Sequence, residues 1–158
     1  AGRHLARLAR RHDLIGALSP VVGMNTACVL WVSAGDPRNY ASGAAYRKAL
    51  GLNLSERSSG MYRGQLRISK RGSALARRFL YFAALRCVSK PPVRHWYVQK
   101  KIRDGEGMRG VIAVMRKLAL AIHATARGEA FDPSRLFNSI VKDDVANRLR
   151  PASLSLRR

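Results

Sequence analysis

Two adjacent serines, Ser58 and Ser59, lie in a polar turn whose chemical surroundings suit attack on a phosphodiester. Gly60 follows them, and Arg57 and Arg63 are close in sequence. A serine hydroxyl can attack a phosphate and conserve the bond energy as a phosphoserine ester, and nearby guanidinium groups can stabilise the developing negative charge. Because serines in turns usually have structural roles, the residue types by themselves make this chemistry a hypothesis.

The chain around these serines is strongly basic. Between Glu56 and Asp104 the sequence has thirteen Lys and Arg and no acidic residue, and the whole chain has 30 Lys and Arg against nine Asp and Glu, a formal net charge of +21. Surfaces usually mix both signs, so this asymmetry indicates a polyanionic partner: DNA, RNA or an anionic membrane surface. A generally basic protein with a chance gap in its acids is the alternative.

Aromatic residues are interleaved with these cations. Aromatic rings often stack on bases in nucleic-acid sites, and four residues are candidates for this contact: Tyr62, Tyr81, Trp96 and Tyr97. Tyr81 lies in an apolar run and is better interpreted as a residue of the core or its edge.

The acidic residues do not form an evident metal site. Metal-dependent nucleases need clustered carboxylates to hold Mg²⁺, whereas here Asp143 and Asp144 lie in a tail and Asp104 and Glu106 in a turn. The four histidines lack the spacing of a zinc site. We therefore expect this chain to bind no metal or cofactor, and any metal ligands to lie outside it.

Composition restricts the class of protein. A chain of 158 residues is long enough for one domain with a core, and a hydrophobic fraction of 47% is too high for a disordered basic tail. No apolar run approaches the roughly 18 residues of a membrane span, and we expect no membrane partner. The two cysteines, Cys28 and Cys87, are expected to be small buried hydrophobes in a reducing compartment.

The basic N-terminal segment can be interpreted in two ways. It lacks the apolar core and cleavage site of a signal peptide. An amphipathic transit peptide is one interpretation, and the end of a helix is the one that we favour. The chain begins at Ala1 rather than Met, which suggests a fragment.

Helical periodicity and capping residues predict an all-α fold: a compact helical domain with an extended basic loop. The glycines and serines of residues 51–72 predict that loop, exposed to solvent. On the helix capped by Ser73 we expect a buried stripe of Leu75, Phe79, Phe82 and either Arg86 or Cys87. The expected helices are 3–18, 25–33, 40–50, 73–89, 93–102 and 108–127, with a short element beginning at 131–133.

The N-terminal part resembles a helix-hairpin-helix. Ser19-Pro20-Val21-Val22-Gly23 is predicted to be a turn between two helices. In that motif, backbone N–H groups at the turn and at the start of the second helix hold a DNA phosphate, which makes Gly23 a candidate DNA contact. A plain helical hairpin fits the pattern equally well.

Several motifs, in order along residues 15–137, resemble one family. Upstream are Ser19 to Ala27 and the Gly35-Asp36-Pro37-Arg38 turn, and downstream is Val114-Met115-Arg116-Lys117-Leu118. The central motifs are Gly51-Leu52, Ser58, Gly60, Ile68-Ser69-Lys70-Arg71-Gly72 and Arg77-Arg78-Phe79-Leu80-Tyr81. Together they are similar to the C-terminal domain of the insertion-sequence transposases of family 110/116/902, relatives of the Piv/MooV site-specific invertases.

The resemblance implies a recombinase with two parts. An N-terminal RNase H-like domain, expected outside this chain, carries four acidic residues and binds Mg²⁺. The C-terminal domain supplies a serine that becomes joined to DNA, and motif spacing places it at Ser58. The family also implies a homo-oligomer, a structured guide RNA from the element, and a bacterial cytoplasmic, nucleoid-associated location. The expected DNA contacts are Arg57, Ser59, Gly60, Arg63, Arg67, Lys70, Arg71, Gly72, Arg77 and Arg78, with Gly23 and Lys117.

We therefore expect a truncated or partial transposase, inactive by itself. Residues 1–14 would end an interdomain linker helix, residues 15–140 would form the serine-bearing domain, and residues 141–158 a loose basic tail. One departure from the family is Ser73, where Asn is usual. The alternatives are a non-catalytic helix-hairpin-helix module that binds nucleic acid, and a basic helical protein that prefers structured RNA.

Overall fold

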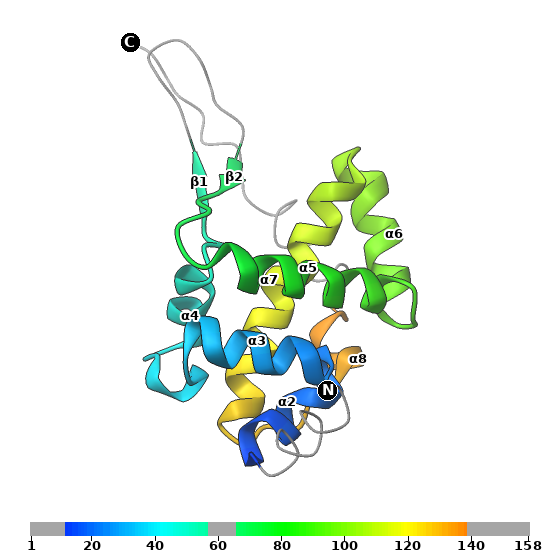
Figure 1. Cartoon of the computed structure of the whole chain (residues 1–158). Coiled ribbons are helices and arrows are strands. Elements are labelled where there is room, and N and C mark those ends of the chain that lie inside the picture. Colours follow the sequence, from blue (N-terminus) through cyan, green and yellow to red (C-terminus); the bar gives the residue numbers. More distant parts are fainter. Residues whose placement is uncertain (1–11, 57–65, 139–158) are drawn as a thin grey trace, which may run out of the picture.

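Helices form most of the computed structural model, which describes residues 12–56 and 66–138 (Figure 1). They confirm the predicted mainly α-helical fold, although the described residues also contain one small sheet. The helices are α2 (Asp13–Val22), α3 (Met24–Ala34), the 3₁₀ turn η1 (Pro37–Asn39), α4 (Gly43–Ala49), α5 (Ala74–Val88), α6 (Val93–Asp104), α7 (Gly107–Ala126) and α8 (Pro133–Leu136); the strands are β1 (Leu54–Glu56) and β2 (Leu66–Ile68).

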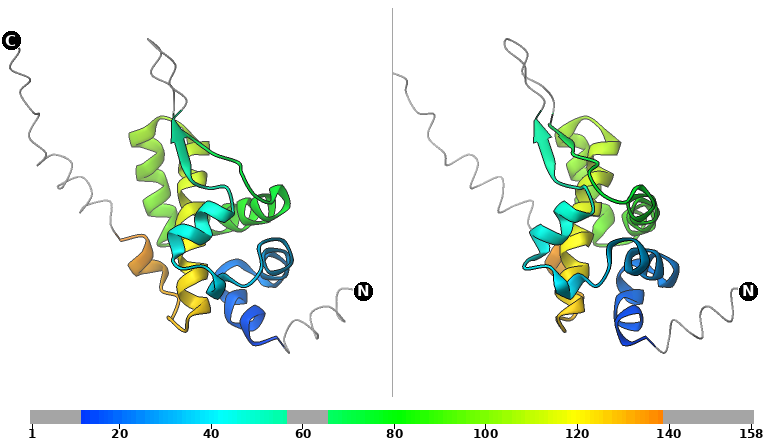
Figure 2. Two further views of the ribbon diagram at one scale, coloured as in Figure 1. Left: turned by 90° about the vertical axis from the view of Figure 1, so that its left-hand side faces the viewer. Right: turned by 60° about the vertical axis from the view of Figure 1, so that its left-hand side comes forward.

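Helix α7 is the centre of the core, and α2, α4, α5 and α6 all pack against it (Figure 2). Its apolar residues recur every three or four positions, which gives the helix a continuous buried face. The predicted stripe is confirmed at Met115, Leu118, Ala119 and Ile122 and is half-buried at Ile112. The length and regularity of this pattern explain why the sequence identified the helix correctly.

The buried face of α5 differs from the prediction. Leu75 and Phe82 are 52% and 43% exposed. The helix packs against both α3 and α7, and small side chains allow this close approach on two sides. The stripe predicted from the large residues was therefore wrong, and the buried residues are Ala76, Leu80, Ala83 and Ala84.

The turn between α2 and α3 is shorter than predicted. Helix α2 continues through Ser19 and Pro20 to Val22, and the exposed Pro20 lies inside the helix. Only Gly23 separates the two helices, with φ +84° and its N–H donating to the Ser19 carbonyl at 2.8 Å. Because glycine adopts positive φ without strain, this one residue ends α2. The structure shows a helical hairpin.

Part of the predicted loop is a β-hairpin. Strands β1 and β2 are antiparallel, with Leu54 opposite Ile68 and Ser55 opposite Arg67. The hydrogen bonds continue below the strands, from the Ser69 N–H to the Asn53 carbonyl at 2.7 Å and from the Lys70 N–H to the Gly51 carbonyl at 3.0 Å. The strands project from the helical body (Figure 2). Strands of three residues carry too little alternation to be recognised from sequence.

Two glycines hold the base of this hairpin in close backbone contact. A Cβ atom on Gly72 would lie 2.1 Å from the Ala49 carbonyl oxygen, and one on Gly51 would lie 2.6 Å from the Arg71 carbonyl oxygen. Both glycines have positive φ, of +136° and +71°. The end of α4 and the loop before α5 therefore meet where only glycine fits, and we call this contact the glycine crossing.

We predict that Gly72→Ala destabilises the chain by about 3 kcal/mol, because the added methyl group meets a backbone oxygen at a φ that alanine avoids. Urea unfolding measures the loss. Gly16→Ala is the matched control, since its Cβ would meet no atom within 4 Å and it lies inside α2, where alanine should add about 0.5 to 1 kcal/mol. Equal stability of the two variants would contradict the glycine crossing.

A second prediction concerns two neighbouring tyrosines. Tyr46 is fully buried and its hydroxyl has no hydrogen-bond partner among the described residues, whereas the Tyr40 hydroxyl donates to the Ala34 carbonyl at 2.6 Å. Burial raises the pKa of Tyr46. Tyr46→Phe should leave stability unchanged or raise it, because an unsatisfied polar group is removed, and Tyr40→Phe should cost about 1 kcal/mol. Urea unfolding measures the stability of both variants. A larger loss of stability in Tyr46→Phe than in Tyr40→Phe would contradict the interpretation that the Tyr46 hydroxyl is unsatisfied.

Candidate nucleic-acid interface

Arg77 connects the two sides of the glycine crossing. Its Nη1 donates to the Gly72 carbonyl at 2.9 Å and to the Leu50 carbonyl at 3.4 Å. Leu50 is the C-cap of α4, so the guanidinium group satisfies a carbonyl at a helix end where positive charge is favourable. The half-buried Arg77 thus positions the base of the hairpin.

The neighbouring cations are open to solvent. Arg67 in β2, Lys70 and Arg71 below it, and Arg78 in α5 are all exposed. None of these four forms an ion pair with a residue that the structure describes. Lys70 has φ +55°, which turns the chain sharply before α5. The fold therefore places these predicted contacts along one continuous segment, accessible to a polyanion.

Ser73 performs the capping role predicted for it. Its Oγ accepts the Ala76 N–H at 3.1 Å and so begins α5. Serine and asparagine are comparable N-caps, so this departure from the family pattern leaves the start of the helix intact.

The predicted nucleophile lies outside the described residues. Ser58 belongs to residues 57–65, together with Arg57, Ser59, Gly60, Tyr62 and Arg63, and their roles stay predictions. The structure does describe both ends of this segment, because Glu56 in β1 is paired with Leu66 in β2. The proposed linker helix is described only from residue 12 onward, and the tail at 141–158 is also outside the described part.

Gly23 has a cationic neighbour that sequence reasoning missed. The Arg86 Nη2 donates to the Val22 carbonyl at 2.8 Å and to the Thr26 Oγ1 at 3.5 Å. A cavity of about 440 Å³ lies beside this turn, and its lining includes Gly23, Arg86 and Lys90. Sequence reasoning placed Arg86 in a candidate buried stripe; the structure exposes it and brings it to the turn between α2 and α3.

Trp96 and Lys117 form part of the core around α8. Trp96 is only 6% exposed and packs edge-on against Phe137, with ring centroids 5.4 Å apart. The Lys117 Nζ lies 5.3 Å from the Trp96 ring and donates to the Leu136 carbonyl at 2.8 Å. Base stacking by Trp96 is therefore a wrong prediction, because the fold leaves only 6% of the residue exposed. Lys117 ties α8 to α7, and its DNA contact stays a prediction.

Tyr81 and Tyr97, the other aromatic candidates that the structure describes, are half-buried. Tyr97 packs so closely against α7 that a Cβ on Gly110 would lie 2.8 Å from its ring, and its hydroxyl donates to the Gly107 carbonyl at 3.4 Å. Tyr81 contacts Phe82 edge-on, with centroids 5.8 Å apart, in agreement with a place at the edge of the core.

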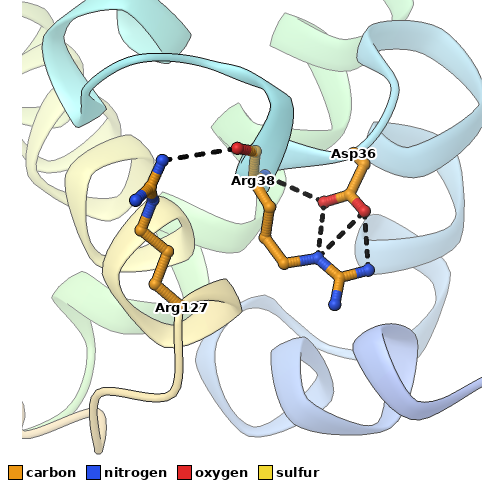
Figure 3. Close-up of polar contacts among 3 residues, drawn as sticks. All are labelled: Asp36, Arg38 and Arg127. Atoms are coloured by element: carbon orange, nitrogen blue, oxygen red, sulfur yellow. Dashed lines mark hydrogen bonds and ion pairs between the residues drawn. The ribbon is translucent and has the colours of Figure 1, made fainter.

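The Gly35 to Arg38 motif has a structural role, because its hydrogen bonds fix the turn after α3. The Asp36 carboxylate accepts from the Arg38 backbone N–H at 2.8 Å and from its guanidinium group, and Arg127 donates to the Arg38 carbonyl at 3.4 Å (Figure 3). The side-chain hydrogen bond from Arg38 is the main reason that the pKa of Asp36 lies below its ordinary value. This network joins the turn after α3 to the end of α7.

Two further arginines were not among the DNA contacts predicted from the sequence. Arg47 and Arg116 lie on α4 and α7, which pack against each other, and the charge of Arg47 contributes to lowering the pKa of Arg116. Arg116 is in the closing motif of the sequence, but nothing in the sequence relates it to Arg47, and only the tertiary fold shows the pair.

The described residues contain no group of three His, Cys, Asp or Glu side chains arranged to hold a metal ion. Both cysteines, Cys28 and Cys87, are free and half-buried. Within the same ranges, no helix has the length and apolar character needed to cross a membrane.

Comparison with known proteins agrees with the motif pattern. Residues 18–99, just over half of the chain, match the family described as Transposase IS116/IS110/IS902. The chain is also 26% identical over 132 residues to a Streptomyces coelicolor protein named "Insertion element IS110 uncharacterized 43.6 kDa protein", a match that covers 82% of the chain and 33% of that relative. The chain thus spans about a third of the relative's length. It belongs to the IS116/IS110/IS902 transposase family.

Proposed function

We propose that this chain is the C-terminal, DNA-binding and serine-bearing part of an insertion-sequence transposase, incomplete and inactive by itself. Family membership supports DNA as the partner, and a net charge of +21 supports binding dominated by phosphate contacts. A homo-oligomer, a structured guide RNA from the element and a nucleoid-associated place in the bacterial cytoplasm belong to the same proposal.

The geometry of the hairpin base carries this proposal. Gly51, Gly72 and Arg77 set where the strands that hold residues 57–65 leave the helical body. Lys70 and Arg71 follow the second strand and are exposed at the same base. A nucleophile carried between these strands would approach a phosphate that the neighbouring cations already attract, and the rigid base would reduce the entropy lost on alignment.

The proposed reaction is a transesterification at a DNA phosphate. Ser58 Oγ attacks phosphorus, a bond between them forms, and the bond from phosphorus to the departing deoxyribose oxygen breaks. The serine loses its proton and the departing oxygen gains one, so the phosphodiester is exchanged without oxidation or reduction. Arginines of this chain would neutralise the pentavalent transition state.

The family implies Mg²⁺ in the RNase H-like domain. We place the ion in that other domain, as the family implies. When bound there, Mg²⁺ would supply charge stabilisation to the phosphate oxygens. This chain would supply the nucleophile, the phosphate contacts and the position of both.

We predict that Ser58→Ala abolishes the covalent protein–DNA adduct in a transposase reconstituted with the acidic domain, while DNA affinity changes less than about twofold, because one hydroxyl contributes little to phosphate binding. Denaturing gel electrophoresis with end-labelled element DNA detects the adduct. Ser59→Ala is the matched control and should keep it. An adduct that survives in Ser58→Ala would point to Ser59 or Tyr62 and overturn the assignment.

A non-catalytic helix-hairpin-helix module is the second candidate. It is favoured by the helical hairpin at Gly23, where Arg86 and Lys90 line the adjacent cavity. Such a module would bind DNA with a steep salt dependence and would show no adduct even after reconstitution. The same gel therefore separates the two candidates.

A further inference from the structure

Packing between α4 and α7 brings two arginines together. Gly43 on α4 lies against α7, where a Cβ added to it would be 3.1 Å from Leu120 Cδ2. One turn further along α4 is Arg47, and one turn before Leu120 is Arg116. Both are half-buried. The His123 ring also contacts the Tyr40 carbonyl at 3.1 Å, one turn before Gly43, so the two helices run past each other with Arg47 on the side of Arg116. The positive charge of Arg47 contributes to the lowered pKa of Arg116, in agreement with this packing.

Neither guanidinium group is satisfied by the fold. The Nε atoms of Arg47 and Arg116 are both buried without a hydrogen-bond partner, and neither side chain pairs with a carboxylate of the described residues. Several acids are engaged elsewhere, as in Asp36 with Arg38 and Glu106 with Arg109. Burial, and then repulsion from Arg47, lower the pKa of Arg116. Two partly desolvated like charges on packed helices, with no carboxylate partner among the described residues, cost stability.

We propose that Arg47 and Arg116 together bind one phosphate group of a nucleic-acid backbone. The chemistry favours this ligand, because guanidinium groups match the oxygens of phosphate with paired hydrogen bonds and remain charged when partly buried. A single anion between the groups would accept hydrogen bonds from both and remove their repulsion.

The position of the pair favours nucleic acid as the source of the phosphate, an identification that rests on the proposed function. The Arg47 carbonyl accepts the Leu52 N–H at 3.1 Å, so the pair adjoins the start of the hairpin. Gly72 packs on the Ala49 carbonyl, two residues after Arg47, and this contact brings Lys70 and Arg71 to the same end of α4. A nucleic-acid backbone that contacts those exposed cations would therefore pass the end of α4 that carries Arg47.

The test is binding of a mixed-sequence, fluorescein-labelled DNA duplex to the 158-residue chain, measured by fluorescence anisotropy at several salt concentrations. Arg116→Gln and Arg47→Gln should each weaken binding about tenfold and lower the slope of log affinity against log salt by about 0.9, the value for one phosphate. The double variant should lose little more, because both arginines hold the same group. Arg109→Gln, which removes an exposed arginine paired with Glu106, is the control and should stay within about twofold.

Thermal unfolding distinguishes a phosphate-binding role of these arginines from a purely structural one. In phosphate-free buffer Arg116→Gln should unfold at the same temperature as the unaltered chain or higher, because a repulsion is removed. Inorganic phosphate should raise the unfolding temperature of the unaltered chain above its effect on Arg116→Gln, with chloride at equal ionic strength as reference.

Four outcomes would overturn the proposal. If Arg116→Gln and Arg47→Gln unfold earlier in every buffer and keep the full salt slope, the arginines are structural. If phosphate stabilisation is lost but DNA affinity is kept, the pair binds an adventitious ion only. If the unaltered chain binds DNA and both variants bind equally well, this site fails while the proposed function stands; a chain without DNA affinity overturns both.

Discussion

The close contact between Gly72 and the Ala49 carbonyl is the constraint on which the candidate site depends. It joins the end of α4 to the loop before α5, and Gly51 makes the reciprocal approach to the Arg71 carbonyl. Arg77 then spans both sides with its guanidinium group. Since α4 and α5 each pack on α7, the hairpin is held by the core through its base, which is formed by close backbone contacts and by the Arg77 side chain across them.

Charge distribution explains why this scaffold suits a polyanion. The acids of the described residues often pair locally, for example Asp36 with Arg38 and Asp104 with Lys100. Such pairs stabilise turns and helix ends and neutralise only their near neighbours. The remaining cations repel one another in the free chain. Any polyanion that binds the folded form therefore relieves this repulsion, so binding and folding stability are linked.

The sequence predicted the helices with long periodic patterns or clear caps, and the structure confirms α7 and the Ser73 cap of α5. The sequence-based predictions failed where contacts between helices determine which side chains are buried. Small residues face the core on α5 because two helices approach it, and Trp96 is covered by Phe137. The relation between Arg47 and Arg116 could not be predicted from the sequence either. Helix periodicity shows which face of a helix a residue occupies, but not which other helix will cover that face.

The family motif contains two kinds of residue that the sequence does not distinguish. Gly51, Gly72 and Arg77 are explained by folding, since each makes contacts that another residue could not make at that place. Lys70 and Arg71 are exposed, and their side chains have no carboxylate partner among the described residues. The fold does not use these two side chains, which leaves them available to a ligand. The described part of the motif is therefore best understood as a structural base that presents cations beside the strands β1 and β2.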